Sequence, residues 1–270
     1  MTVKTTFPAM IAYAHRRPAV FCLWLTAAIS LVFLVFPTVD QAVSAWFYDT
    51  AEGFLGPRNE TLRAVRELGL FTPKLIVGVL VAALLLKIAL PYAASLIPVN
   101  VSLFLISSLI IGPGLLVNGV LKAHWGRPRP RNTDLFGGDL PFMPPWLISN
   151  HCADNCSFVS GEASSSFWVL AFAFVVPKEW RVATLSVLIP YVVIMSFNRV
   201  IFGGHYFSDV LIAWTLNFLI LLFAYRFWLA DPPPAVRPER MEARLTHLGL
   251  GLRRLVGLGH GPINQVRNGV

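Results

Sequence analysis

The chain has little charge and little cysteine for its size. Only 13% of its 270 residues are charged, about half of the roughly 25% that is typical of soluble domains, and 56% are hydrophobic. This composition argues against a disordered, a soluble or a nucleic-acid-binding protein, although the net charge is +8. The three cysteines are too few for a disulfide scaffold, and no internal repeat is visible.

Long apolar runs are what the sequence does have. A transmembrane helix needs ~20 largely apolar residues, and the runs predict an all-α, polytopic membrane protein built as a six-transmembrane-helix bundle. The expected spans are 19–39, 71–90, 99–121, 160–176, 182–197 and 206–229. A signal peptide is the competing interpretation of the first run, but the run is long for a signal core.

The distribution of basic residues predicts the topology. An even number of spans places both termini on one side, and more of the 22 Lys and Arg residues lie on that side than on the other. This bias favours cytoplasmic termini in the inner membrane. We therefore expect a cytoplasmic segment at 1–18, a membrane domain at 19–230 and a basic cytoplasmic tail at 231–270, with the loops between the first and second, third and fourth, and fifth and sixth spans on the periplasmic face.

The tail has a helical pattern of apolar residues. Those residues are Met241, Leu245, Leu248, Leu252 and Leu255. Arginines accompany them, which is typical of an amphipathic helix on an anionic membrane surface. Three glycines weaken the pattern, so a disordered basic tail remains an alternative.

Three polar segments on the periplasmic face hold charged residues that topology does not require. They are 122–130, 157–164 and 198–209. Lys122, Arg129 and Arg199 would place three cations at one membrane face, where guanidinium forks and an ammonium suit phosphate oxygens. Ser160 and Gly161 stand where a helix begins, and free N–H groups there bind anions.

His205 and Asp209 suggest chemistry beside this anion site. Residues four apart share a helix face, and a carboxylate next to an imidazole orients it and stabilises its cation. Asp209 also lies just inside an apolar span, where an ionisable group is costly and usually functional. A phosphate site beside an oriented histidine indicates phosphoryl transfer. An anion transporter and a phosphate-binding protein without catalysis are the alternatives from other classes.

These segments resemble the type 2 phosphatidic acid phosphatase family, whose pattern is Lys-x6-Arg-Pro, Pro-Ser-Gly-His and Ser-Arg-x5-His-x3-Asp. Residues 122–130 match the first element in full, and 198–209 match the third, with Asn198 in place of serine. The second element keeps Ser-Gly but has Val159 for proline and Glu162 for histidine. This Ser-Gly-Glu variant is similar to a subgroup of bacterial lipid A phosphatases.

The resemblance implies a membrane phosphatase that needs no metal or other cofactor and acts on a phosphorylated lipid. It implies that His205 attacks phosphorus to form a phosphohistidine and that Asp209 orients it. The residues that it implies for holding the phosphoryl oxygens are Lys122, Arg129, Ser160, Gly161 and Arg199. The identity of the lipid, transfer of the phosphoryl group to a second lipid instead of water, and the oligomeric state all stay open.

Glu162 stands where the family has the histidine that protonates the departing oxygen. A protonated glutamic acid can do the same, but nearby cations would lower its pKa, whereas a bound phosphate dianion would raise it. Two alternatives remain. The leaving group needs little protonation, or His124 or His151 donates the proton instead.

Cys152 and Cys156 lie in the loop before Ser160, and on the periplasmic face a disulfide between them is expected. The alternative is a metal site that includes His151 and Asp154. No zinc spacing template fits this arrangement, so we expect a short disulfide at the entrance of the site and no metal.

Overall fold

The computed structural model describes residues 13–14 and 16–257. Most of the expected N-terminal segment 1–18, and residues 258–270 of the expected tail, therefore lie outside the described residues. The chain divides into two compact units. The first contains the residues up to Leu75 and Ser107–Tyr225, and the second contains Ile76–Ile106 and the residues from Arg226 onward.

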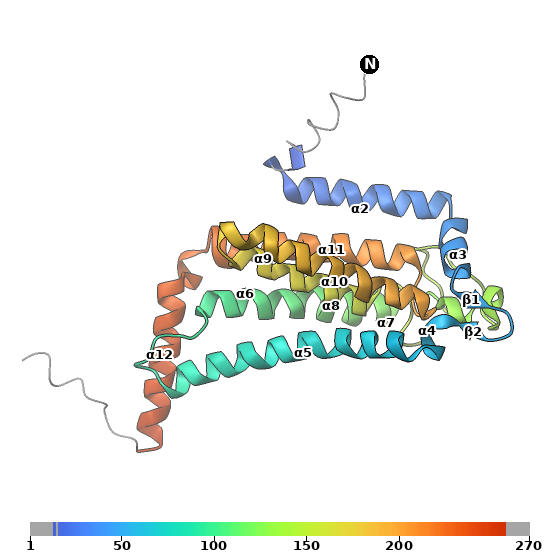
Figure 1. The fold of residues 1–270 in the computed structure, drawn as a ribbon. Coiled ribbons are helices and arrows are strands. Elements are labelled where there is room, and N and C mark those ends of the chain that lie inside the picture. The colour runs from blue at the N-terminus through green and yellow to red at the C-terminus, as the bar shows by residue number, and fades with distance from the viewer. Residues whose placement is uncertain (1–12, 15, 258–270) are drawn as a thin grey trace, which may run out of the picture. The chain divides into compact units, whose positions relative to one another are not determined.

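The first unit is a bundle of helices joined by turns and irregular segments, of which 125–160 is the longest (Figure 1). In chain order its elements are α2 (Pro18–Val35), α3 (Thr38–Ala45), β1 (Tyr48–Asp49), β2 (Gly53–Phe54), α4 (Leu55–Arg58), the first part of α5 (Glu60–Ala89), the end of α6 (Val99–Leu109), a π-helical stretch (Ile110–Leu121), α7 (Lys122–His124), α8 (Gly161–Trp168), α9 (Phe172–Val175), α10 (Arg181–Ile201) and α11 (Phe207–Tyr225). The two strands form one antiparallel hairpin.

The helices confirm an all-α membrane protein, but the expected count of six spans is not confirmed. Among the described residues, five helices are long and apolar enough to cross a bilayer. They are Pro18–Val35, Glu60–Ala89, Val99–His124, Lys178–Ile201 and Phe207–Ala230. The fourth expected span is the shorter apolar segment Gly161–Val175, which does not reach the ~20 residues that a full crossing needs.

Helix α5 begins well before the expected span. Residues 60–70 were expected in an external loop, yet they continue the same helix as the apolar run. Asn198 ties α5 to α10, because its side-chain amide donates to the Leu62 carbonyl over 3.0 Å. A tertiary contact, which hydropathy does not register, thus stabilises the polar first turns of the helix.

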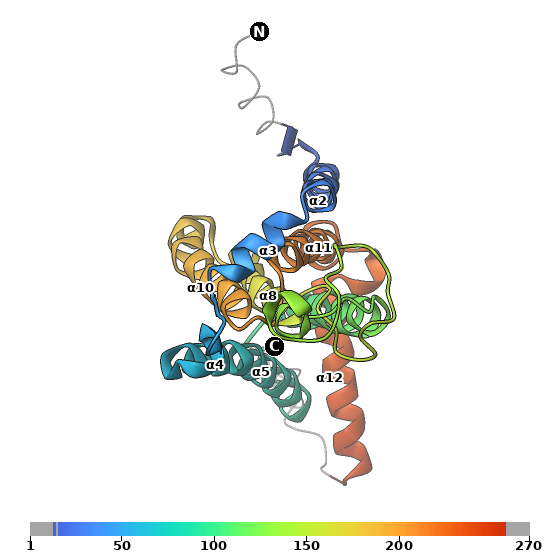
Figure 2. The same cartoon turned by 90° about the vertical axis from the view of Figure 1, so that its right-hand side faces the viewer.

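Helix α8 lies between α10 and α11 and packs against both (Figure 2). Its first turns are made of small residues, and a side chain at Gly161 would collide with the Asn118 amide. Around them lies a buried apolar cluster that includes Leu121, Phe158, Val200 and Val210. This packing holds the beginning of α8 beside the end of α10 and the beginning of α11.

The second unit contains the rest of α5, most of α6 and α12 (Pro238–Leu255). The tail residues 238–255 are therefore helical, as the apolar spacing indicated. Lys87 is buried and pairs with Glu242 of α12 at 3.0 Å, while Gly249 allows α12 to approach the Ile88 carbonyl closely. Contact of α12 with a membrane surface stays a prediction.

Candidate active site

The structure brings the three predicted polar segments together within the first unit. The site forms where α7 and α10 end and where α8 and α11 begin. The loop before α8 supplies the remaining side chains. The expected site residues from 122–130, 157–164 and 198–209 therefore lie in one place.

His205 is almost completely buried, with 1% of its surface exposed, in the turn between α10 and α11. Its Nδ1 lies 2.7 Å from the Ser157 carbonyl oxygen. Because a carbonyl only accepts hydrogen bonds, Nδ1 carries the proton and Nε2 keeps a lone pair. Burial, followed by the charges of Arg199, Arg129 and Lys122, lowers the pKa of His205 well below its usual value. The imidazole is therefore neutral near pH 7.

Asp209 does not contact His205 directly. Its Oδ2 lies 3.9 Å from His205 Nδ1, beyond hydrogen-bond distance. Oδ2 instead accepts from the Ser157 hydroxyl at 2.5 Å and from the Tyr206 amide at 3.0 Å. His205 precedes the first residue of α11, so the expected helical i,i+4 geometry does not apply. Ser157 relays the contact, since its carbonyl binds the imidazole and its hydroxyl binds the carboxylate.

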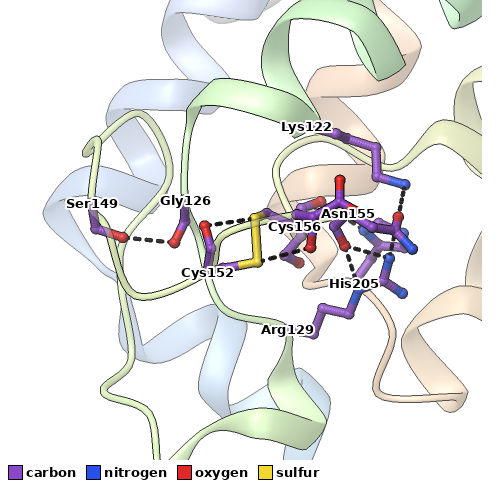
Figure 3. The surroundings of a disulfide bond; sticks show 10 residues. Lys122, Gly126, Arg129, Ser149, Cys152, Asn155, Cys156 and His205 are labelled. Carbon is purple, nitrogen blue, oxygen red and sulfur yellow. Dashed lines mark hydrogen bonds between the residues drawn. A yellow bond between two sulfur atoms is a disulfide. The ribbon is translucent and has the colours of Figure 1, made fainter.

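Lys122 and Arg129 converge on one residue, Asn155 (Figure 3). The Lys122 ammonium donates to the Asn155 side-chain oxygen at 2.7 Å. Arg129 Nη2 donates to the same oxygen at 2.8 Å and to the Asn155 carbonyl at 2.7 Å. Burial and the charge of Arg131 lower the pKa of Arg129. Both side chains thus aim their donors at a single cluster of oxygens.

Arg199 is 2% exposed and lies near the end of α10. Gly204 makes room for it, because a side chain there would collide with the guanidinium. Arg199 Nε lies 3.2 Å from the Glu162 carboxylate. Within the described part of the chain, Arg199 Nη1 is buried and has no hydrogen-bond acceptor. We call Lys122, Arg129 and Arg199 the cation cradle.

Glu162 lies in the first turn of α8 and is held by two arginines. Besides Arg199, Arg66 contacts it through Nε at 3.3 Å and Nη2 at 3.2 Å. Arg66 was not predicted as a site residue, because it lies in the part of α5 that was expected to be a loop. The charged start of α5 is the sequence signal that could have identified it.

Ser160 and Gly161 begin α8 as expected. The Ser160 side chain is fully buried and caps the helix by accepting a hydrogen bond from the Ala163 amide at 3.2 Å. His124 and His151, the alternative proton donors, are both exposed. The two histidines therefore lack the burial of Ser160, Arg199 and His205.

Asp40, Arg127 and Ser208 complete the site and were missed by the sequence analysis. Arg127 donates to Asp209 at 2.6 Å and to Asp40 at 2.8 Å, and all three side chains are 0% exposed. Ser208 binds Asp40 through its amide at 2.8 Å and its hydroxyl at 2.5 Å. We call Asp40, Arg127, Ser208 and Asp209 the buried network. Burial opposes the charge of Arg127, yet Asp209 and Asp40 raise its pKa.

Cys152 and Cys156 form a disulfide whose Cα atoms lie 5.8 Å apart (Figure 3). The bond closes a short loop that contains Asn155, which adopts a left-handed backbone with φ 49°. Asparagine tolerates this conformation better than most residues. The disulfide thus holds the acceptor of Lys122 and Arg129, and it occupies both thiols that the alternative metal site would need.

Comparison with known proteins finds a family match and relatives that are lipid phosphatases. Residues 101–232 match the PAP2 superfamily. The chain is 37% identical over 190 residues to the lipid A 4'-phosphatase of Francisella tularensis subsp. novicida (strain U112), which covers 67% of this chain and 82% of that protein. It is 45% identical over 115 residues to the lipid A 4'-phosphatase of Rhizobium leguminosarum, covering 43% of this chain. That alignment spans 49% of the Rhizobium protein, about half of its length.

A solved structure shares the fold. The crystal structure of a transmembrane PAP2-type phosphatidylglycerolphosphate phosphatase from Bacillus subtilis superposes with a TM-score of 0.54. It covers 78% of this chain and 96% of its own, at 17% sequence identity. At this identity the likeness concerns the arrangement of the helices.

Proposed function

Because the chain belongs to the PAP2 superfamily, we propose that it is a membrane phosphatase that removes a phosphate from a lipid through a phosphohistidine. The names of the Francisella and Rhizobium relatives favour lipid A as the substrate and its 4'-phosphate as the group removed. In this proposal His205 is the nucleophile and Glu162 is the acid, while Asp209 acts on His205 through Ser157.

The hydrogen bond between His205 Nδ1 and the Ser157 carbonyl, at 2.7 Å, is the observation that carries the proposal. The neutral imidazole presents an Nε2 lone pair beside three cations whose charges act on it. A neutral nucleophile next to an excess of positive charge suits attack on a phosphate dianion. In the first step Nε2 bonds to phosphorus and the bond to the lipid oxygen breaks. In the second, water attacks phosphorus, the N–P bond breaks, and inorganic phosphate leaves.

The cation cradle would hold the phosphoryl oxygens during both steps. A phosphate oxygen would give Arg199 Nη1 the acceptor that it lacks within the described residues. Other phosphate oxygens would take the donors of Lys122 and Arg129 that now bind Asn155. The amides at the start of α8 add to the site, because a helix N-terminus favours anions.

Glu162 is proposed as the acid that protonates the departing lipid oxygen. Its carboxylate is held by Arg66 and Arg199. A phosphate dianion that takes over Arg199 would remove one of those contacts and bring a negative charge close. Glu162 would then be released from Arg199 and free to face the leaving oxygen.

We further propose that the site faces the periplasm across the inner membrane and that both termini lie in the cytoplasm. The disulfide beside the site supports this side, because disulfides persist in oxidising compartments. An alkaline phosphatase fusion in the 131–150 loop should be active, and one at the C-terminal tail should be inactive. The opposite pattern would place the site in the cytoplasm.

Lipid analysis tests the function itself. Mass spectra of lipid extracts from cells with and without the gene should differ by one phosphate on one lipid class, and lipid A is the expected one. Turnover by the purified protein should survive EDTA, as the family resemblance implies. Identical lipid phosphorylation in the two extracts would contradict the proposal. Loss of turnover in EDTA would indicate that the reaction needs a metal ion.

A further inference from the structure

Asp40 reaches the candidate active site from a part of the chain that the family match does not include. It lies in α3 (Thr38–Ala45), well before the matched residues 101–232. Its carboxylate is 0% exposed and accepts hydrogen bonds from Arg127 and Ser208. No other charged side chain of α3 is present, so this contact is specific to one residue.

We propose that Asp40 is a positioning residue of the phosphatase, which acts on His205 through Arg127 and Asp209. The inference rests on the proposed function, since it assumes that His205 is the nucleophile. It assigns to α3 a part in the chemistry that the three sequence motifs do not contain.

The contacts form one continuous path. Asp40 Oδ2 binds Arg127 Nη2 at 2.8 Å, and Arg127 Nη1 binds Asp209 Oδ1 at 2.6 Å. Asp209 Oδ2 accepts from the Ser157 hydroxyl, and the Ser157 carbonyl holds the Nδ1–H of His205. A shift of Arg127 would therefore move the Asp209 carboxylate and, with it, Ser157, which orients the His205 imidazole.

The path is rigid because its side chains are buried and their hydrogen-bonding groups have partners. Arg127 makes four hydrogen bonds through its three nitrogens. Besides those to Asp40 and Asp209, one runs from Nε to the Met143 carbonyl at 2.8 Å and one from Nη1 to the Ser208 hydroxyl at 2.9 Å. Its guanidinium also lies over the Tyr206 ring, 4.2 Å from the centroid. A group held from several sides in a dry environment has one arrangement, which is what a positioning residue requires.

Charge gives Asp40 a second role. Arg127 and Asp209 alone would form a neutral pair, and Asp209 would offer little negative charge to the histidine. With Asp40 the network carries two carboxylates and one guanidinium, so one negative charge remains beside the imidazole. His205 gains positive charge as Nε2 bonds to phosphorus, and a nearby negative charge stabilises it.

A purely structural role for Asp40, as an anchor for α3, predicts a different outcome. Loss of an anchor lowers thermal stability but leaves the pH dependence of the surviving activity unchanged. Loss of a charge that acts on His205 changes both the turnover and the pH at which the imidazole is protonated. The acid limb of kcat/KM reports that protonation in the free enzyme.

The experiment is Asp40→Asn in the full-length protein, assayed in detergent with lipid substrate and compared with wild type. We expect kcat to fall on the order of 10–100-fold, as for loss of an outer partner in other sites, with KM nearly unchanged. The acid limb should move to lower pH. The charged groups around His205 are the cations Lys122, Arg129 and Arg199 and the carboxylate of Asp209. Removing the negative charge of Asp40 leaves the repulsion from the cations less compensated, which lowers the pKa of His205 further.

Asp49→Asn is the matched control, because it makes the same change at an exposed carboxylate close to α3. It should keep the wild-type kcat and pH profile. A folded Asp40→Asn protein with wild-type kcat and acid limb would overturn the inference. Absence of turnover in wild type would instead defeat the proposed function, so the two failures are distinguishable.

A double variant covers the case in which Asp40→Asn does not fold. Asp40→Leu with Arg127→Met removes both partners of one buried pair, so that one carboxylate, Asp209, loses its guanidinium instead of the two that lose it when Arg127 alone is replaced. We expect this protein to turn over at least 10-fold more slowly than wild type, by the same reasoning on outer partners. Wild-type turnover in the folded double variant would also overturn the inference.

Discussion

Two groups of basic residues meet in this site, and their surroundings differ. Arg127 of the buried network is 0% exposed and has a carboxylate on either side. The cation cradle has three cations. Within the described residues, one carboxylate pairs with them, that of Glu162, and it contacts Arg199. A cation with matched partners is a fixed part of the structure. Under the proposed function, the cations in excess of their partners bind the phosphate of the substrate.

The contrast extends to the kind of acceptor. The network uses carboxylates, which satisfy a guanidinium strongly. Lys122 and Arg129 are held by the neutral oxygens of Asn155, which a phosphate oxygen can replace with a stronger charge-assisted bond. The difference between network and cradle is therefore a difference between permanent and replaceable partners, and the following variants test it.

His205→Ala should have the largest effect. It removes the proposed nucleophile and leaves the cradle intact, so turnover should be abolished while binding of the phosphorylated lipid remains. Release of inorganic phosphate measures turnover, and binding of the phosphorylated lipid to detergent-solubilised protein measures affinity. A residual rate within about tenfold of wild type (~1.4 kcal/mol) would mean that another residue attacks phosphorus.

Glu162→Gln should have the next largest effect. It keeps the shape of the side chain but removes the proton, and general acid catalysis contributes typically ~10²–10⁴-fold. A lipid with a poor alkoxide leaving group should lose activity in that range, whereas p-nitrophenyl phosphate should lose much less. Equal losses for both substrates would refute the acid role and leave Glu162 as the structural partner of Arg66 and Arg199.

Arg199→Gln and Arg127→Gln compare the cradle with the network directly. Loss of Arg127 leaves two buried carboxylates unpaired, which costs about 3–5 kcal/mol of stability, so its melting temperature should fall sharply. Loss of Arg199 should mainly lower kcat/KM, by roughly 10²-fold, at a melting temperature close to that of wild type.

The pH dependence of kcat/KM distinguishes the cradle from the network by the direction in which its acid limb moves. Burial, followed by the charge of Arg199, lowers the pKa of His205, so wild-type kcat/KM should persist to a pH below the usual histidine value of about 6.5. Arg199→Gln removes a nearby cation and should move the acid limb to higher pH, opposite to Asp40→Asn. Movement of both limbs in one direction would contradict the distinction between the two groups.

Replacing Cys152 and Cys156 by serine should have the smallest effect. The disulfide holds the loop of Asn155 and touches no proposed catalytic atom, so we expect a loss of a few fold in kcat/KM at unchanged acid limb. Dithiothreitol should reproduce this loss in wild type and leave the double variant unaffected. Sensitivity of the variant to dithiothreitol would assign the effect to another group.

The motifs predicted the cradle and His205 because they lie at the ends of spans that hydropathy can place. Lys122, Arg129, Arg199 and His205 meet in the structure as the bundle arrangement required. Those predictions needed only chain order, span limits and one shared membrane face.

The missed residues depend on contacts that no local pattern contains. Asp40 and Arg127 are 87 residues apart in the chain, and Arg66 and Glu162 are 96 apart. Asp40 follows an apolar run like any polar residue at a span end, and Arg66 was assigned to a loop. The count of six spans is not confirmed for a related reason, since the apolar segment at 161–175 is short and packs against neighbouring helices.

The positions of Asn155 and Glu162 have a consequence for the end of the catalytic cycle. Both residues supply oxygens to the cations that would bind phosphate. Association of phosphate is therefore an exchange of one set of acceptors for another, and its affinity is the difference between the two. In the proposed mechanism, these oxygens compete with inorganic phosphate for the same donors once the phosphohistidine is hydrolysed. A site that must attract a dianion can in this way also release one.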